Sequence, residues 1–298
     1  MKQILWMAPA LILISCGNNA GDYDATGTFE ATEVTVSAEQ NGRLMVFAAE
    51  EGDMVEAGRQ VGLIDTVQLY LKAEQIGATK TIYAARRPEI EKQIAATREQ
   101  LAKAKQEYER YSGLVRDGAA NQKQLDDAES QMKVLQRQLT AQLSELNIST
   151  NSLNAQMSTA DLEKLQVLDQ LYKCRVISPI TGTILESYAE QGEYATVGKP
   201  LFKVADIEEM YLRAYVTTAQ LQKVKLGQQV RVFADYGDGE RKEYEGKVTW
   251  ISSKSEFTPK TILTDDERAD LVYAVKIRVR NDGYIKIGMY GEVKLNEE

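Results

Sequence analysis

The feature that most constrains this chain is a heptad repeat of apolar residues in its middle third. Between residues 121 and 172 an apolar residue recurs every seven positions, at Leu125, Met132, Leu139, Leu146, Leu153, Ala160 and Val167. This period places one apolar stripe along one side of a long helix, as in a coiled coil. Outside the stripe the residues are mainly Gln, Glu, Lys and Arg, so we expect the outer face to be solvated.

A similar pattern precedes it, over Val67–Val115. Its apolar positions are Leu69, Ala73, Ile76, Tyr83, Ile90, Ile94, Leu101, Ala104, Tyr108, Tyr111 and Val115, while Lys80 and Arg87 also fall on the stripe. Pro88 lacks a backbone N–H, so it should kink this helix or restart it at the first turn. A Gly-containing turn at residues 116–121 joins two arms of about 50 residues. We therefore predict an antiparallel helical hairpin, each arm roughly 75 Å long.

Two short segments that flank the hairpin resemble each other. Gly42, Gly52 and Gly58 of the first segment correspond to Gly182, Gly192 and Gly198 of the second, each shifted by 140 positions. Glycine is common where the backbone needs a positive φ, so the shared spacing indicates one repeated structural unit. Two unrelated sets of hairpin turns are the alternative.

This paired pattern resembles the two halves of a lipoyl or biotinyl domain, a flattened β sandwich with pseudo-two-fold symmetry. In the carrier domains of that family a modified Lys lies on the hairpin between the halves. Gln68 stands at that position here, and the chain enters a helix instead of turning back. A Gln side chain has no amine to acylate, so a lipoyl-type carrier is the less favoured alternative.

The N-terminal segment has Lys2, then a short apolar run, and ends in Leu13-Ile14-Ser15-Cys16. The run is too short to span a bilayer and resembles a bacterial lipoprotein signal, in which the chain is cleaved before an acylated Cys. An ordinary signal peptide is the alternative. We expect a lipid anchor at Cys16, followed by a short tether. The remaining cysteine, Cys174, is expected to be a buried apolar residue.

The C-terminal part is rich in short strands. Residues 210–216, 228–234, 246–251, 271–280 and 292–295 alternate as strands, with a short helical stretch near Ala219. These predict a small β barrel. The fold class is thus an elongated α+β chain, a split lipoyl-like sandwich with an inserted coiled-coil hairpin, plus a barrel. The predicted parts are a signal peptide 1–15, a tether 16–22, a sandwich 37–66 and 174–206, a hairpin 67–173, and a barrel 23–36 and 207–298.

Three residues at the hairpin turn carry a further resemblance. Three residues separate Arg110 from Leu114, and six separate Leu114 from Asn121. This resembles the Arg, Leu, Ser triad at the hairpin tip of periplasmic adaptor proteins, the membrane fusion proteins of the haemolysin-secretion D type. Asn121 replaces the Ser and can still donate and accept hydrogen bonds. The alternative is purely structural: Arg110 as a solvated charge, Leu114 as a seam residue and Asn121 as a helix N-cap.

The order of modules and the segments FTPKTILTDDERADLVYAVKIRV and GMYGEV resemble adaptors that are paired with ABC-type exporters. The resemblance implies a tripartite efflux or secretion system that links an inner-membrane ABC-type transporter to a TolC-type outer-membrane channel. It also implies a self-assembled ring, sixfold in that family, and a periplasmic location. We expect the lipid in the inner membrane, although Gly17 after Cys16 gives no retention signal. A lipid-anchored spacer without a transporter is the structural alternative.

Charge and composition exclude several other classes. The net charge is −8 and the chain has no His, which argues against nucleic-acid binding and excludes imidazole bases and His metal ligands. No Gly-rich phosphate loop is present either. We assign no catalytic, cofactor-binding or metal-binding residue, and no cofactor, and expect that energy comes from a partner.

Overall fold

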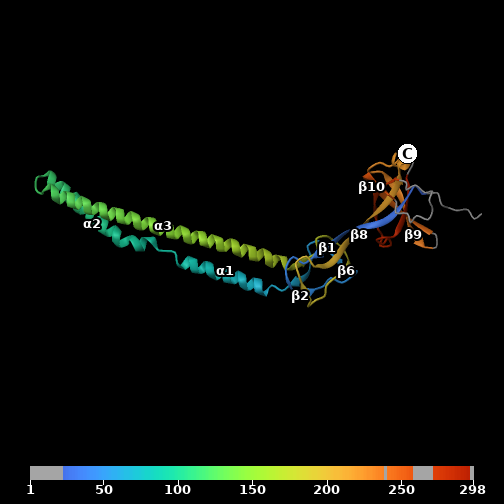
Figure 1. The fold of residues 1–298 in the computed structure, drawn as a ribbon, viewed down its shortest axis with the longest axis horizontal. Helices are drawn as coiled ribbons and strands as arrows, with labels where there is room; N and C mark the ends of the chain where they lie inside the picture. Colours follow the sequence, from blue (N-terminus) through green and yellow to red (C-terminus); the bar gives the residue numbers. More distant parts are fainter. Residues whose placement is uncertain (1–22, 238–239, 258–270, 296–298) are drawn as a thin grey trace, which may run out of the picture.

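The protein is an elongated molecule in which a helical hairpin, a β sandwich and a β barrel follow one another (Figure 1). The structure is a computed structural model and describes residues 23–237, 240–257 and 271–295. The predicted fold class is confirmed. The predicted leader and tether, including Cys16, lie outside the described residues.

The hairpin is built from three helices. The first arm is α1 (Val67–Ala85) followed by α2 (Ile90–Arg116), and the second arm is α3 (Gln122–Lys173). α3 is a single helix of 52 residues, roughly 78 Å long at about 1.5 Å per residue. The first arm is interrupted, because α2 starts anew from Glu89 as its N-cap. Pro88 therefore lies before the restarted helix and not in its first turn, and residue 87 is biased away from helix by the proline that follows it.

The two arms meet along the predicted stripe. Its buried members are Ala73, Ile94 and Ala104 from the first arm and Ala160 and Val167 from α3, and Leu135 of α3 is buried beside them. Lys80, the charged residue expected on the stripe, forms an ion pair of 2.7 Å with Asp161 of α3. The positive charge of Lys80 between the two arms is therefore neutralised by Asp161 of the other arm. The pair also shows that residue 80 of α1 lies level with residue 161 of α3.

The sandwich packs two sheets over one core. Its strands are β2 (Gly42–Phe47), β3 (Met54–Val55), β4 (Gln60–Ile64), β5 (Arg175–Ile177), β6 (Gly182–Ser187) and β7 (Tyr194–Ala195), with parts of β1 (Ala25–Ser37) and β8 (Pro200–Thr217). One sheet has the order β5-β4-β2-β7, and the other is formed by β3, β6, β8 and β1. Leu44, Ile64, Ile184 and Phe202 are fully buried or nearly so between them.

The two halves of the sandwich are interlocked by reciprocal hydrogen bonds. Gly52 N–H donates to Ile184 O at 2.9 Å, and Gly192 N–H donates to Leu44 O at 2.8 Å, which is the same bond shifted by 140 residues. Gly52 and Gly192 both have φ of 93°, a conformation that favours glycine. β3 of the first half pairs with β6, and β7 of the second half pairs with β2. The repeat predicted from the glycine spacing is therefore a structural repeat.

The barrel is a closed ring of six strands. β9 (Gln229–Gly237), β10 (Glu240–Phe257), β11 (Leu271–Arg280) and β12 (Tyr290–Leu295) join parts of β1 and β8 in the order β1-β12-β9-β10-β11-β8, and β1 also pairs with β8. The short helix α4 (Thr218–Leu221) follows β8. Phe29, Leu212, Val232, Ile277 and Val293 belong to its core.

The barrel and the sandwich share two long strands. Phe29 of β1 is in the barrel core, whereas Val34 and Val36 of the same strand pack against the sandwich core. Residues 23–36, which we expected in the barrel alone, thus contribute to both modules. A register shift between Glu30 and Thr32 in the pairing with β8 lies where β1 leaves the barrel and enters the sandwich.

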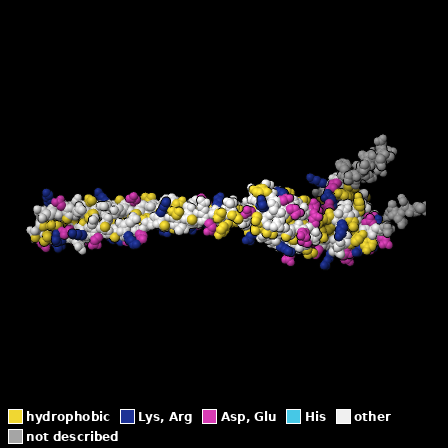
Figure 2. Space-filling view, turned by 90° about the horizontal axis from the view of Figure 1, so that it is seen from below, with side chains coloured by type: hydrophobic (Ala, Val, Ile, Leu, Met, Phe, Trp, Pro, Cys, Tyr) yellow, Lys and Arg dark blue, Asp and Glu magenta, His cyan; other side chains and the backbone are white. Residues whose placement is uncertain are grey.

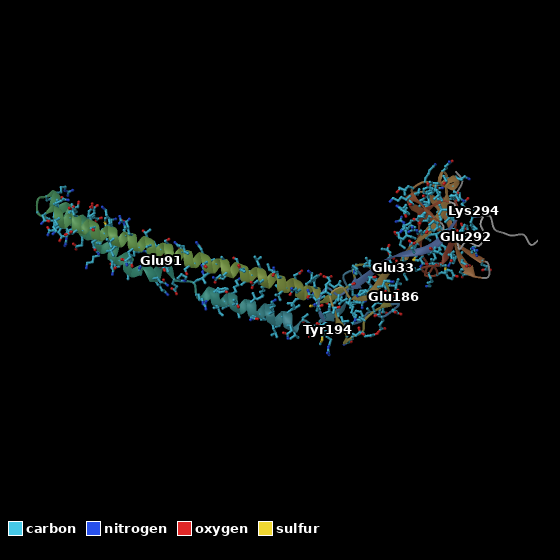
Figure 3. The ribbon with its side chains drawn as sticks, viewed as in Figure 1. Glu33, Glu91, Glu186, Tyr194, Glu292 and Lys294 are labelled. Carbon is cyan, nitrogen blue, oxygen red and sulfur yellow. The ribbon has the colours of Figure 1, made fainter. Side chains whose placement is uncertain are left out.

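Ion pairs bridge the exposed face of this junction. Lys203 Nζ lies 2.8 Å from Glu186 and 3.7 Å from Glu33, and these two carboxylates lie beside the sandwich in Figure 3. The hydrogen bond with Glu186 raises the pKa of Lys203 above its ordinary value. The pairs connect β6, β8 and β1, so they oppose shear between these strands.

One side chain cluster in the barrel gives a pH-dependent prediction. Lys242 hydrogen bonds to Asp282 and lies 5.4–5.7 Å from the ring centroids of Tyr236, Tyr244 and Tyr284. The bond from Lys242 lowers the pKa of Asp282 from 3.8 to about 2. A carboxyl whose pKa is lowered by folding contributes stability above its unfolded pKa, and this contribution is lost as the pH falls toward about 2.

We therefore expect Asp282→Asn to flatten the pH dependence of barrel unfolding between about pH 4 and pH 2. The measurement is denaturant unfolding followed by the fluorescence of Trp250 in β10. Asp53→Asn, a change in a loop of the sandwich, is the control and should leave this dependence as in the wild type. An equally steep dependence in the Asp282 variant would contradict the assignment.

Candidate functional site at the hairpin tip

The end of α2 is closed by a tight backbone turn. Ala119 N–H donates to Leu114 O at 2.7 Å, and Gly118 N–H donates to Val115 O at 3.1 Å. Gly118 has φ of 73°, so this is a Schellman motif with glycine in the left-handed position. The turn fixes the direction in which the chain leaves α2, which makes the tip a defined shape.

Asn121 begins α3 as its N-cap. Gln124 N–H donates to Asn121 Oδ1 at 2.9 Å, and Asn121 N–H donates to Gln124 Oε1 at 3.3 Å. This reciprocal pair is a capping box, which satisfies two N–H groups at the helix start. The structural role that the sequence left open for Asn121 is therefore present. Asn121 is exposed, so its side-chain amide can still meet a partner.

Arg110 and Leu114 lie one turn apart on the same side of α2. Arg110 forms an ion pair with Glu107, and its guanidinium carbon lies 5.2 Å from the ring centroid of Tyr111. Leu114 is 37% exposed. The structure thus brings the three predicted residues to one end of the rod, each accessible to solvent.

Sequence reasoning did not assign three neighbours of this site. Glu107 and Tyr111 hold Arg110 from two sides, and Gln124 completes the cap of Asn121. The signals were available: an acidic residue three positions before an arginine, and Asn followed three positions later by Gln.

Two substitutions test the capping role of Asn121 separately from its role as a contact residue. Asn121→Ala removes the cap and should cost about 1 kcal/mol of helix stability, which would fray the first turn of α3. Asn121→Ser keeps a capping oxygen and restores the residue type of the adaptor triad, so its first turn should stay intact. Hydrogen exchange at the amides of residues 122–125 measures the difference. Equal exchange in both variants would contradict the capping role.

Outside the tip, the described residues offer little reactive chemistry. Residues 23–237, 240–257 and 271–295 contain no group of three or more Cys, Asp or Glu placed to hold a metal ion. Cys174 is fully buried, and burial raises the pKa of its thiol. Gln68 lies in the first turn of α1, where a carrier domain would have its modified hairpin. In the same part of the chain, no helix is both long and apolar enough for a membrane span.

Comparison with known proteins agrees with this architecture. A family model described as "RND MFP, barrel-sandwich hybrid domain" matches residues 32–207, which covers both sandwich halves and the hairpin between them. The "UPF0194 membrane protein YbhG" of Salmonella arizonae is 28% identical over 293 residues, which is 91% of this chain and 88% of that protein.

Solved structures support the fold. The crystal structure of MacA from Actinobacillus actinomycetemcomitans aligns with a TM-score of 0.57 and 22% identity, covering 90% of this chain and 76% of that one. A MacA-MexA chimeric protein that contains the Pseudomonas aeruginosa MexA α-hairpin domain aligns with a TM-score of 0.51 and 21% identity, covering 91% and 80%. The predicted sandwich with an inserted hairpin is therefore a known arrangement.

Proposed function

This chain belongs to the membrane fusion proteins with a barrel-sandwich hybrid domain, and we propose that it connects an inner-membrane ABC-type transporter to a TolC-type outer-membrane channel. Members of this family are periplasmic, membrane-associated adaptor subunits of tripartite efflux systems. The observation that carries the proposal is the tip: a rod roughly 78 Å long ends in a rigid turn that exposes Arg110, Leu114 and Asn121.

The chemistry of the tip suits a contact with the end of a protein channel. Arg110 offers a charged donor that is already oriented by Glu107 and Tyr111, Leu114 offers apolar surface, and Asn121 offers an amide. Such a mixture is typical of small, specific protein contacts. Because the turn is closed by its own hydrogen bonds, little conformational entropy is lost on binding.

The class of the inner-membrane partner has two candidates. The barrel segments FTPKTILTDDERADLVYAVKIRV and GMYGEV support an ABC-type transporter, whose ATPase would supply the energy. The description of the matching family model carries the term RND, which supports an RND transporter as the second candidate. Affinity purification of the full chain from membranes, with identification of the permease that accompanies it, distinguishes the two.

We further propose that Cys16 carries the membrane anchor. The apolar run and Leu13-Ile14-Ser15 before it support cleavage and acylation, and the partner in the inner membrane supports retention there. Growth with labelled fatty acid should label the wild-type chain, whereas Cys16→Ser should remain unlabelled and leave the membrane fraction. An equally labelled variant would exclude Cys16 as the acylated residue.

Assembly into a ring completes the proposal. The adaptor would have no catalytic centre of its own, and several copies would surround a conduit, sixfold as in the family. Native mass spectrometry of the full chain with its transporter should give a closed oligomer. A monomer under these conditions would argue for a spacer protein.

The direct test places a photoreactive amino acid at Leu114. Irradiation of living cells should link this position to an outer-membrane channel, while the same group at Arg137, on the outer side of α3, should not. If no envelope protein is captured at Leu114 although the protein is anchored and folded, the channel contact is wrong.

A further inference from the structure

The outer side of α3 carries apolar and uncharged polar side chains in its middle part. Ile148, Ala155 and Leu162 recur every seven residues, two positions after the seam residues Leu146, Leu153 and Ala160, and so point away from the first arm. Ile148 is 67% exposed, and Leu162 and Leu165 are 62% and 60% exposed. The outer face is exposed here, as expected, but its side chains are apolar or uncharged polar ones.

Charge is missing from this part of α3 over about four helical turns. From residue 146 to residue 160 the helix has no charged residue, while Glu145 precedes this stretch and Asp161 follows it. On the face seen in Figure 2, the part of the rod next to the sandwich likewise shows fewer charged side chains than the tip. An exposed helix face without charge is typical of the core of a protein interface and unusual for solvated surface.

α1 carries a matching stripe on the opposite edge of the rod. Val67, Leu71, Ala78, Ile82 and Ala85 lie on the side of α1 that faces away from α3. Val67, Leu71 and Ile82 are each more than half exposed. Within this stripe of α1, Glu74 is the charged residue. The ion pair of Lys80 with Asp161 places Ala78 and Ile82 level with Leu162, so the two stripes lie at one height.

We propose that these two stripes are the lateral contact between copies of this chain, with the α3 edge of one copy packed against the α1 edge of the next. The proposal rests on the ring proposed above. It adds which helix edges form the contact between neighbouring copies, the head-to-tail direction of that contact, and the part of the hairpin that takes part in it. A second copy is the occupant that fits, because it presents the complementary apolar edge at the same height and in the same orientation. Two different edges make a head-to-tail contact, which closes into a ring when the rotation permits.

The contact ends where the first arm is broken. Beyond residues 86–89 the outer positions of α2 are Lys92, Ala95, Glu99, Ala102 and Gln106, which are charged, polar or small. Arg137 and Lys133 lie on the outer side of the facing part of α3. The root half of the hairpin therefore has two apolar edges, whereas the exposed large apolar residues of the tip half are Leu114 and Val134. The proposed contact accordingly lies in the root half.

Disulfide trapping in the full chain tests this arrangement. Ala78→Cys combined with Leu162→Cys should give a ladder of covalent oligomers on mild oxidation of envelope membranes. Each single variant should give none, because a head-to-tail contact needs both edges. The pair Gln106→Cys with Ser130→Cys, on the outer sides of the tip half, is the matched control and should also give none. Cys174 is fully buried and should not interfere.

A second test removes the contact. Leu162→Glu with Leu165→Glu should weaken assembly at least tenfold in native mass spectrometry, with the helical circular dichroism unchanged, because both side chains are exposed. Ser130→Glu should assemble as the wild type. If the wild type forms a ring but neither test responds, the assigned edges are wrong while the adaptor function stands.

Other results also overturn the proposal. Dimers from Leu162→Cys alone would show a symmetric contact between two α3 edges. A link from position 162 to another protein would assign the stripe to that partner. A wild-type protein that stays monomeric with its transporter would overturn the ring itself and, with it, the lateral contact.

Discussion

Export by cells that carry Arg110→Asp is expected to fall to the level of cells lacking the protein. Arg110 is exposed near the end of α2, and its carboxylate replacement would present like charge beside Glu107 where a donor is needed. Loss of one exposed ion pair affects stability little. Efflux or secretion by a strain expressing the variant, compared with the deletion strain, measures the effect.

The control for this result is Arg137→Asp, which makes the same change of charge on α3 away from the tip. It should export as the wild type, and both variants should give the same thermal unfolding. Wild-type export by the Arg110 variant, at equal protein level, would remove the tip from the channel contact.

Gly27→Ala is expected to destabilise the barrel by about 3 kcal/mol, near the upper end for overpacking. Gly27 of β1 lies where β8 and β12 both pair with this strand, and an added Cβ would lie 2.0 Å from Arg213 O and 2.6 Å from Ala214 Cα. These are backbone atoms, so a strand must move. In a chain without its leader, Trp250 is the single tryptophan and its fluorescence reports barrel unfolding.

Gly113→Ala is the matched substitution in the hairpin. Nothing lies within 4 Å of a Cβ added there, and the residue is inside α2, so alanine should stabilise the helix by up to about 1 kcal/mol. We expect the change in the free energy of unfolding to have opposite signs in the two variants, a loss for Gly27→Ala and a gain for Gly113→Ala. If the Gly27→Ala variant were as stable as the wild type, β1 and β8 would have to move apart at this point at little cost in free energy.

Much of the fold could be predicted because it depends on periodic features. The seven-residue spacing of Leu125, Met132 and their successors specified α3, and the shared glycine spacing specified a repeated unit. The exchange of strands between the halves was not predictable, since it depends on hydrogen bonds such as that of Gly52 with Ile184, far apart in sequence. The sharing of β1 between two cores has the same cause.

The tip was predictable in part. Arg110, Leu114 and Asn121 were predicted from their resemblance to the adaptor triad beside the predicted turn, but their exposure and the support from Tyr111 required coordinates. The apolar outer stripe of α3 was missed because the seam accounted for the heptad pattern. A second stripe at the same period, offset by two positions, is visible only when the buried face is known.

The interlocked sandwich has a consequence for the order of folding. Its two halves are separated by roughly 100 residues, and closing a flexible loop of that length costs about 4 kcal/mol. A hairpin that forms first removes this loop-closure free energy. Its antiparallel arms bring Lys173 back beside Val67 before the two halves meet. We therefore expect the hairpin to form before the domain at its base and to hold the two halves together while they pair. Equal turns can be added to or removed from both arms without disturbing that domain, so the reach of the molecule can change independently of the rest.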